Sequence, residues 1–430
     1  MLIEFRVANH RSLRDEQVLT MEAGRAGDQT DPRPRDVPGH PEKLLTVAGL
    51  YGANASGKSN VLAALSFMCE AVVMSHRYWS PDEGKPREPV VPRDPFAWGP
   101  KRKEPSLFEV TFLIDQVRYQ YGFQVSDEQF TEEWLYAWPS GKKQVWFERD
   151  NQTFNFGAHL KGENRVIVEV TRPNALFLSA AVQHKHPQLA PIFAWFRSLE
   201  VINVRGVRYP SLPFEIASEL TLARLMEEDA DQRTLFQEEE LPKALLEDFR
   251  NLLKLADIGI VDLRVERSKS GDKRRHLGSI FFLKHQSESD DAWLPLREES
   301  HGTRTLFHMA LPVLQVLQNG GVLLVDELER SLHPSLARRI IEQFNDPAAN
   351  PKNAQTIFTT HDTNLLGTTL GEPALRRDQV WLTEKDAEGA TVLYPLTDYK
   401  PRKAENLECG YLQGRYGAIP FLGGFLATRE

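Results

Sequence analysis

The feature that most constrains this chain is a glycine-rich loop between an apolar segment and a segment with helical spacing. The loop reads Gly52-Ala53-Asn54-Ala55-Ser56-Gly57-Lys58-Ser59-Asn60 and fills every fixed position of the pattern G-x-x-x-x-G-K-S. The apolar residues 44–48 before it predict a buried strand, and the good helix formers of residues 61–68 predict a helix after it. A strand, a glycine loop and a helix in this order predict a phosphate-binding site.

The chemistry of such a loop explains its residue types. Glycines let successive backbone N–H groups curl around a β-phosphate, and the helix that begins near Lys58 directs its positive dipole end at the same oxygens. The Lys58 ammonium is then expected to reach the β- and γ-phosphates, and the Ser59 hydroxyl to ligate Mg²⁺. The alternative is a glycine-rich turn with a surface lysine, which is less favoured because all fixed positions are filled and both flanks fit.

A second apolar segment ends in two adjacent carboxylates. Residues 320–327 read GGVLLVDE, which predicts a strand with Asp326 and Glu327 at its tip. There Asp326 is placed to hold Mg²⁺, directly or through water, and Glu327 to orient and deprotonate an attacking water. The pair is a moderate signal alone and a strong one beside the glycine loop.

Two further positions are candidates with a plainer alternative. His361 follows a predicted buried strand at residues 355–360 and would lie on the ligand side of a parallel sheet, where a γ-phosphate can be sensed. Ser300 and Gly302 precede a predicted helix at residues 305–317 and offer a second anion site at a helix start. The alternative in both places is ordinary helix capping.

Composition excludes several classes of protein. With 430 residues, 41% of them hydrophobic and 26% charged, the chain is expected to be globular with more than one lobe. Cys69 and Cys409 lack metal-site spacing, which indicates a reducing compartment, such as the cytoplasm, and no disulfide framework. Residues 1–6 alternate as a strand, not as a signal peptide, and no apolar run is expected to approach the ~20 residues that span a bilayer.

Charge limits the kind of nucleic-acid contact that this chain can make. The formal net charge of −8 argues against wholesale coating of nucleic acid, so any contact is confined to a local patch. Two patches qualify, the triplet Lys101-Arg102-Lys103 and a basic hairpin tip with Arg267, Lys269, Lys273, Arg274 and Arg275. The alternative for both is a solvated loop.

The chain divides into three predicted parts around these motifs. Residues 1–204 hold the glycine loop and an antiparallel β subdomain, with strands expected at 107–114, 117–125, 133–138, 144–149 and 165–170. Residues 205–300 form a short helical insertion at 215–257 and a basic hairpin of strands 260–267 and 279–284. Residues 301–430 carry the carboxylates and the tail. The predicted fold class is α/β, with a mixed sheet, an antiparallel β lobe and a helical insertion.

The order of motifs resembles the ABC-type ATPase heads shared by SMC, RecF and OLD-like proteins, which are P-loop NTPases. Residues 52–59 resemble Walker A, 299–303 the ABC signature, 322–327 Walker B, 328–332 the D-loop, and His361 the switch histidine. Asn9-His10-Arg11-Ser12 is similar to an Asn-Phe-Arg-Ser motif at the nucleotide's edge, with His10 in place of the aromatic residue. The signature differs from the Leu-Ser-Gly-Gly-Gln of transporters, which argues against that branch.

This resemblance implies ATP and Mg²⁺ as cofactors, with Arg11 beside the nucleotide. It also implies a homodimer or higher homo-oligomer with shared sites, in which Ser300 and Gly302 close over the γ-phosphate of the facing subunit. Residues 328–334 and the tail 410–421 further resemble the bacterial AAA-type ATPases of abortive infection, including the RloA/AbiL group. Such relatives imply anti-phage defence beside a separately encoded, nuclease-like effector. The alternative for the tail is a packed C-terminal strand and turn.

Three functions follow, and the first is favoured. It is an ATP-hydrolysing sensor or scaffold that dimerises around nucleotide and controls a partner, without a membrane. The second is a DNA-repair ATPase of RecF/SMC type, which the two basic patches favour. The third is a nucleotide-dependent structural protein with negligible turnover, against which Glu327 argues because a base is pointless without hydrolysis.

Overall fold

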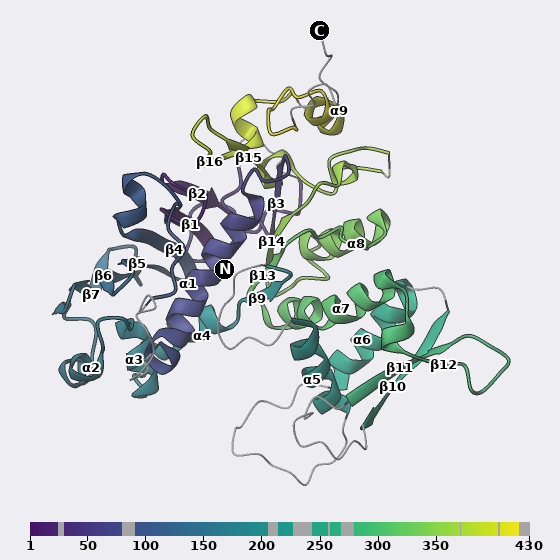
Figure 1. Ribbon diagram of the computed structural model, residues 1–430, viewed down its shortest axis with the longest axis horizontal. Helices are drawn as coiled ribbons and strands as arrows, with labels where there is room; N and C mark the ends of the chain where they lie inside the picture. The colour runs from purple at the N-terminus through teal and green to yellow at the C-terminus, as the bar shows by residue number, and fades with distance from the viewer. Residues whose placement is uncertain are drawn as a thin grey trace.

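A six-stranded sheet at the centre of the molecule carries the glycine loop (Figure 1). The computed structural model describes residues 1–24, 30–79, 91–204, 214–226, 243–256, 259–267, 279–369, 371–402 and 405–420. The strand order is β16-β15-β3-β14-β13-β9. The strands are β3 (Val47–Gly52), β9 (Glu200–Ile202), β13 (Val322–Val325), β14 (Gln355–Thr359), β15 (Val380–Lys385) and β16 (Thr391–Pro395). All neighbouring pairs are parallel except β15–β16, so the carboxyl ends of β3, β13 and β14 meet at one edge.

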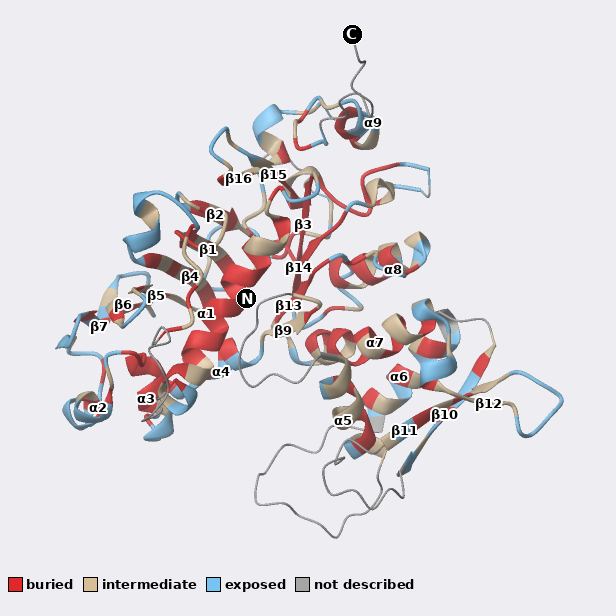
Figure 2. Ribbon diagram, viewed as in Figure 1, coloured by how far each residue is buried: buried red, intermediate tan, exposed pale blue. Residues whose placement is uncertain are grey.

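Both faces of this sheet are covered, which explains why its inner strands are buried without alternation. Every residue of β3, β13 and β14 is buried (Figure 2). Ala48 and Leu50 belong to one hydrophobic core, and Val47 and Tyr51 belong to the other. Side chains of a strand alternate between faces, so the two cores lie on opposite sides of the sheet.

Helix α1 (Lys58–Tyr78) fills the first core, between the central sheet and a second sheet. Among the described residues it is the one helix whose length and composition would suit a membrane span, and 72% of its most apolar window is buried inside the protein. The prediction that no apolar segment approaches the ~20 residues that span a bilayer is therefore wrong for α1, which has 21 residues. The burial is that of a core helix.

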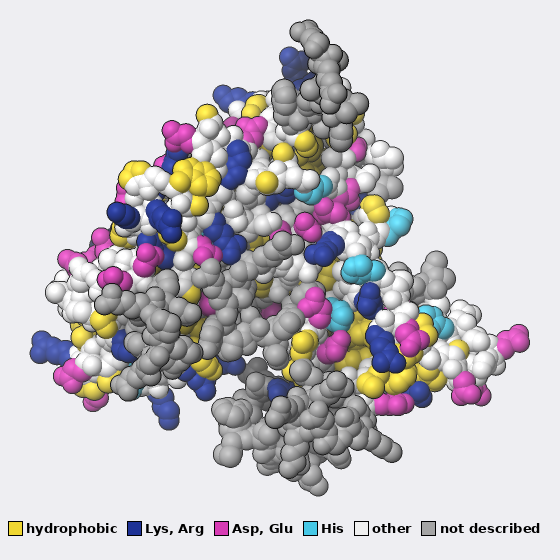
Figure 3. Space-filling view, viewed as in Figure 1, with side chains coloured by type: hydrophobic (Ala, Val, Ile, Leu, Met, Phe, Trp, Pro, Cys, Tyr) yellow, Lys and Arg dark blue, Asp and Glu magenta, His cyan; other side chains and the backbone are white. Residues whose placement is uncertain are grey.

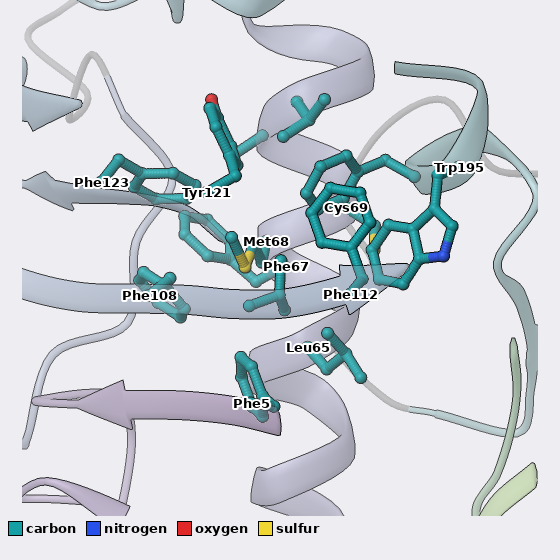
Figure 4. Packing of buried hydrophobic residues seen from close by; sticks show 14 of the residues in the cluster. Phe5, Leu65, Phe67, Met68, Cys69, Phe108, Phe112, Tyr121, Phe123 and Trp195 are labelled. Atoms are coloured by element: carbon teal, nitrogen blue, oxygen red, sulfur yellow. The ribbon is translucent and has the colours of Figure 1, made fainter. Parts of the chain in front are cut away.

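The second sheet is antiparallel and has seven strands in the order β2-β1-β4-β5-β6-β7-β8. They are β1 (Leu2–Ala8), β2 (Gln17–Thr20), β4 (Ser106–Ile114), β5 (Val117–Val125), β6 (Phe130–Trp138), β7 (Gln144–Asp150) and β8 (Thr153–Phe156). The predicted hairpin forms across Asp115 and Gln116, both of which have positive φ, as a tight two-residue turn requires. Figure 4 shows Phe108, Phe112 and Phe123 of this sheet against Phe67 and Met68 of α1.

The remaining helices surround these sheets. The α-helices are α2 (Asn164–Val170), α3 (Phe177–Gln183), α4 (Ala190–Arg197), α5 (Phe214–Met226), α6 (Lys243–Ala256), α7 (His301–Asn319), α8 (Pro334–Asn345) and α9 (Leu407–Leu412). The 3₁₀ helices are η1 (Pro100–Lys103), η2 (Leu296–Glu298), η3 (Thr363–Leu365), η4 (Arg377–Gln379) and η5 (Leu396–Tyr399). Helices α5 and α6 pack on α7 with a three-stranded antiparallel sheet, β10 (Ile260–Arg267), β11 (Ser279–His285) and β12 (Trp293–Pro295). The helical insertion and the hairpin strands are thus confirmed. Of the basic tip, Arg267 ends β10, while Lys269, Lys273, Arg274 and Arg275 lie outside the described residues.

Several predicted elements differ from the structure. Residues 165–170 are helix α2 and not a strand, because only the face with Asn164 and Ile167 packs, while Val166 and Val170 are exposed. The strand predicted at 44–48 instead begins at Val47 and continues to Gly52, since β14 and β15 pair with it on both sides. Helix α7 begins at His301, four residues before the predicted start.

The central sheet joins distant parts of the chain. Its strands come from residues 47–52, 200–202 and 322–395. The division at residues 204 and 300 stays a prediction, because no independent observation bears on those boundaries.

Candidate nucleotide site

The loop between β3 and α1 depends on glycine at two positions. Gly52 has φ +156° and Gly57 has φ +109°, and Ala55 between them is also left-handed at φ +62°. A side chain at Gly57 would collide with that of Thr391, and one at Gly52 would approach the Thr383 hydroxyl to 2.5 Å. The local chain path therefore requires glycine where the sequence pattern places it.

Hydrogen bonds of hydroxyl groups anchor this loop. The Thr391 hydroxyl donates to the Ser56 carbonyl at 2.7 Å, and the Ser56 and Thr383 hydroxyls lie 2.5 Å apart. Ser12 extends the same network, since its Oγ is 2.7 Å from Thr391 Oγ1 and accepts from Asn60 Nδ2 at 2.7 Å. Ser12 and Asn60 thus anchor the loop, and the strand pair β15–β16 supplies its two threonines.

Lys58 lies at the centre of the loop. Its Nζ donates to the carbonyls of Gly52 at 2.9 Å and Ala53 at 3.0 Å, and the residue is 7% exposed. Burial lowers the pKa of the Lys58 amine to about 8, although the nearby carboxylates of Asp326, Glu329 and Glu327 act in the opposite direction. Burial removes water that would otherwise solvate the Lys58 ammonium. An anionic ligand beside it would therefore stabilise the charged form of this side chain.

Ser59 and Asp326 meet although they lie far apart in the sequence. The Ser59 hydroxyl donates to Asp326 Oδ1 at 2.8 Å, and the Thr359 hydroxyl donates to the same oxygen at 2.6 Å. Asp326 is 6% exposed, and its backbone N–H donates to the Ile202 carbonyl at 3.0 Å. Three strands, β9, β13 and β14, therefore fix one carboxylate beside the first turn of α1.

Glu327 differs from its neighbour in exposure and backbone. It has φ +57°, and its side chain is 53% exposed, with Arg330 at 3.8 Å. Its backbone N–H donates to Thr359 Oγ1 at 2.8 Å, so a single threonine hydroxyl ties Asp326 and Glu327 together. A left-handed non-glycine residue is strained, and such residues cluster at functional sites. The Glu327 side chain is half exposed, so water has access to its carboxylate.

His361 completes the cluster from the end of β14. Its backbone N–H donates to Glu329 Oε1 at 2.7 Å. Burial, and next the positive charge of Lys58, lower the pKa of the His361 imidazole, which favours the neutral ring. Glu329 therefore joins the loop after β13 to the loop after β14, a role that the sequence did not reveal.

Ser300 and Gly302 lie apart from this cluster, at the start of α7. Ser300 Oγ accepts from the Thr303 N–H at 3.1 Å, so Ser300 forms the helix cap that was the alternative to an anion site. A Cβ at Gly302 would lie 2.9 Å from the Ser331 carbonyl, which places the start of α7 against the turn after Glu327. Within the part of the chain that the structure describes, no hydrogen bond or ion pair joins Ser300 or Gly302 to residues 52–60.

The N-terminal motif has both structural and loop contacts. Asn9 Nδ2 donates to the carbonyls of Lys101 and Glu104, each at 2.7 Å, and His10 stacks on Phe67 with 5.7 Å between ring centroids. His10 thus occupies the core as an aromatic residue would. The Arg11 side chain pairs with Asp94 at 3.3 Å, while Ser12 contacts the glycine loop network.

The structure thus gathers Lys58, Ser59, Asp326, Glu327 and His361 at the carboxyl edge of the central sheet. Sequence reasoning missed the three threonines that hold them, Thr359, Thr383 and Thr391. The available signal was a polar residue at the carboxyl end of a buried strand, as in Thr359 of β14.

The donor set suits one kind of metal ion. No group of three or more His, Cys, Asp or Glu side chains able to hold a metal occurs among the residues described. One hydroxyl and one carboxylate, Ser59 and Asp326, are what Mg²⁺ uses when phosphate oxygens and waters complete its shell. The residues present therefore fit Mg²⁺ in company with a phosphate ligand.

A strand, a phosphate-type loop, a helix and a carboxylate strand on a parallel sheet define the class, which is a P-loop nucleoside triphosphatase fold. The chain belongs to the family described as "AAA domain, putative AbiEii toxin, Type IV TA system", whose profile matches residues 47–367. The predicted fold class is confirmed as an α/β P-loop NTPase with a mixed central sheet, an antiparallel β lobe and a helical insertion.

Solved structures similar to this chain include SMC head domains. A head bound to the C-terminal winged-helix domain of ScpA has 12% identity and a TM-score of 0.47, over 91% of this chain and 96% of that one. The SMC head domain from Thermotoga maritima has 13% identity and a TM-score of 0.37, over 92% of this chain and 98% of that one. No curated protein was found to match.

Proposed function

We propose that this protein binds ATP with Mg²⁺ at the site above and hydrolyses it. The observation that carries the proposal is the meeting of Lys58, Ser59 and Asp326, in which a buried ammonium lies beside a hydroxyl and a carboxylate that share a hydrogen bond of 2.8 Å. An ammonium neutralises phosphate oxygens, while the hydroxyl and the carboxylate suit a bound Mg²⁺. A site for a neutral ligand would not require a buried ammonium together with this hydroxyl and carboxylate.

Hydrolysis requires a base on the open side of the phosphate site. When bound, Mg²⁺ neutralises charge on the phosphate oxygens. In the proposal, Glu327 accepts a proton from the attacking water, since its carboxylate is half exposed and joined to Asp326 through Thr359. A neutral His361 at the end of β14 donates a hydrogen bond to the γ-phosphate. Lys58 leaves the carbonyls of Gly52 and Ala53 for phosphate oxygens.

The test compares ATP binding by the full chain and two variants. Lys58→Ala should abolish measurable binding in titration calorimetry with MgATP, because the phosphates lose their strongest cationic partner. Lys161→Ala is the matched control, since this lysine is exposed and far from the loop in sequence. Equal affinity for ATP in wild type and Lys58→Ala would contradict the proposal.

The proposed active form is a pair of chains that share two sites. Ser300 and Gly302 make no described contact with their own loop and present the start of α7 beside Ser331. In the paired state they close over the γ-phosphate held by Lys58 of the facing chain. ATP, which has this phosphate, then favours the pair, and ADP does not.

The proposed biological role is anti-phage defence of the abortive-infection type, with a separately encoded, nuclease-like effector under the control of the ATPase. The family description, which names a putative toxin of a type IV toxin–antitoxin system, supports this role. Loss of phage resistance in cells carrying Glu327→Gln, with protein levels unchanged, is the expected result. Full resistance of that variant would separate defence from hydrolysis.

A second candidate function is contact with DNA, as in a DNA-repair ATPase of the RecF/SMC type. It is favoured by the exposed Arg102 and Lys103 on η1, although Lys101 pairs with Glu104 at 2.7 Å. On the face that Figure 3 displays, Lys and Arg are interspersed with Asp and Glu. Binding that depends on these residues should weaken steeply with salt, and reversal of both charges without effect on DNA binding would remove this candidate.

A further inference from the structure

The C-terminal residues 405–420 pack against β3, the strand that leads into the phosphate loop. The proposed function gives them no role. They fold as α9 and a series of turns, whereas the alternative for this tail was a packed strand and turn. Leu407, Tyr411, Tyr416 and Ala418 belong to the same hydrophobic core as Tyr51 of β3. Figure 1 shows α9 beyond β3, at the edge of the sheet where the phosphate loop begins.

Tyr411 contacts the residues that open the phosphate loop. Its ring meets that of Tyr51 edge to face, with centroids 5.6 Å apart. Its hydroxyl donates to the Ala418 carbonyl at 3.2 Å. Burial raises the pKa of Tyr411, and the nearby backbone of Gly52 acts in the opposite direction. Lys58 donates to the carbonyl of Gly52 at 2.9 Å, so the start of the phosphate loop lies between Lys58 and the Tyr411 ring packed on Tyr51.

Glu408, one helical turn before Tyr411, contacts the loop that follows His361. Its Oε1 accepts from the Thr363 hydroxyl at 2.9 Å. A Cβ at Gly367 would overlap its carboxylate, so glycine there makes room for Glu408. The Tyr51 hydroxyl donates to the Asp362 carbonyl at 3.0 Å, which links the two contacts into one chain from the phosphate loop to the loop of His361.

The C-terminal segment is itself held firmly enough to act as a support. The Ala418 N–H donates to Glu384 of β15, and the Tyr416 hydroxyl donates to Glu405 at 2.7 Å. Glycine at 410 allows the Tyr416 ring to lie against α9. The segment is therefore fastened to β15, the strand that pairs directly with β3.

We propose that Tyr411 and Glu408 are positioning residues of the nucleotide site, in which Tyr411 fixes the first residue of the phosphate loop and Glu408 fixes the loop that carries His361. The inference rests on the proposed function, because both loops are assigned there to bound ATP. It predicts different kinetic effects for the two residues. The phosphate loop holds ATP and ADP alike, whereas His361 acts on the γ-phosphate alone.

The first test is Tyr411→Phe, which removes the hydroxyl and keeps the ring. ATP and ADP should both bind about fivefold more weakly, which is the usual effect of one hydrogen bond, while kcat at saturating ATP stays within about twofold. Tyr136→Phe is the matched control, since that hydroxyl bonds to Glu148 at 2.7 Å on the seven-stranded sheet. Thermal unfolding of both variants separates a loss of affinity from a loss of folded protein.

The second test is Glu408→Ala, with Glu408→Gln as the conservative variant. The alanine variant should lower kcat about fivefold and leave ADP affinity unchanged, and glutamine, whose amide oxygen still accepts from Thr363, should restore most of kcat. Thr363→Val removes the same bond from its other side, so its effect should not add to that of Glu408→Ala.

The outcomes distinguish this inference from the proposed function. If wild type binds ATP, Lys58→Ala does not, and Tyr411→Phe and Glu408→Ala both match wild type in affinity and kcat, the inference is overturned and the function stands. If wild type fails to bind ATP, the proposed function falls and takes the inference with it. Loss of stability without the split between affinity and kcat would also overturn the positioning role.

Discussion

Thr359 offers the sharpest test of how this site works, because one hydroxyl serves both carboxylates. It donates to Asp326 Oδ1 at 2.6 Å and accepts from the Glu327 N–H at 2.8 Å. Thr359→Val keeps the shape of the side chain and removes both hydrogen bonds. Asp326 then loses a donor that orients it, and Glu327 loses the bond that holds its left-handed backbone.

The expected magnitude follows from these two bonds. A hydrogen bond to a charged group contributes about 1.5–3 kcal/mol, and an orphaned buried N–H costs about 1–3 kcal/mol. Solvent reaches the half-exposed Glu327 and offsets part of the second loss, so the free energy of unfolding should fall by about 2–4 kcal/mol. If the first bond is what orients Asp326 toward Mg²⁺, the Mg²⁺ concentration needed for half-maximal turnover should rise about ten- to a hundredfold.

The assay measures phosphate release at saturating ATP over a range of Mg²⁺ concentrations, beside urea unfolding of the same proteins. Thr359→Ser keeps the hydroxyl and should retain most of the Mg²⁺ response. Thr356→Val is the matched control, because Thr356 lies on the same strand three residues earlier, and side chains at odd spacing point to opposite faces. A wild-type Mg²⁺ response in Thr359→Val would refute the reasoning, whatever its stability.

Three further predictions concern Lys58, Glu327 and Ser300. Because burial places the pKa of the free Lys58 amine at about 8, ATP affinity should be level below pH 8 and fall above it by up to about tenfold per pH unit, and an unchanged affinity at pH 9 by calorimetry would contradict this. Glu327→Gln should keep ATP bound but slow hydrolysis about 10²–10⁴-fold, and a wild-type rate would remove Glu327 as the base. Ser300→Arg should block ATP-dependent pairing in light scattering together with hydrolysis, and full activity from monomeric Ser300→Arg would defeat the shared site. Mixed with Lys58→Ala chains, it should rebuild at most one site of two, because both changes fall on the same composite site.

The sequence by itself determined the parts of the site whose chemistry is local. Residues 52–59 place glycine at two positions of the loop where the backbone has a positive φ, Gly52 and Gly57. Likewise, Asp326 and Glu327 follow four apolar residues that form β13, so their place at a strand tip was predictable. These features need only near neighbours, which is why spacing was sufficient.

Tertiary structure decided whatever depends on partners from distant parts of the chain. Strand β3 extends to Gly52 because β14 and β15, about 300 residues later, pair with it on both sides. Residues 164–170 become helical because only one of their faces meets the core, although their β-branched side chains favour a strand. Local propensity is weak beside such packing, so the prediction failed there.

The same reason separates the predicted site residues from those that were missed. Lys58, Ser59, Asp326, Glu327 and His361 each belong to a short motif, and the fold brings them to one edge. Spacing could not predict the roles of Thr359, Glu329 and Tyr411, because each acts on residues that only the folded chain brings near. Sequence motifs predict the side chains that would contact a phosphate. Which residues hold those side chains in position depends on the packing of the folded sheet.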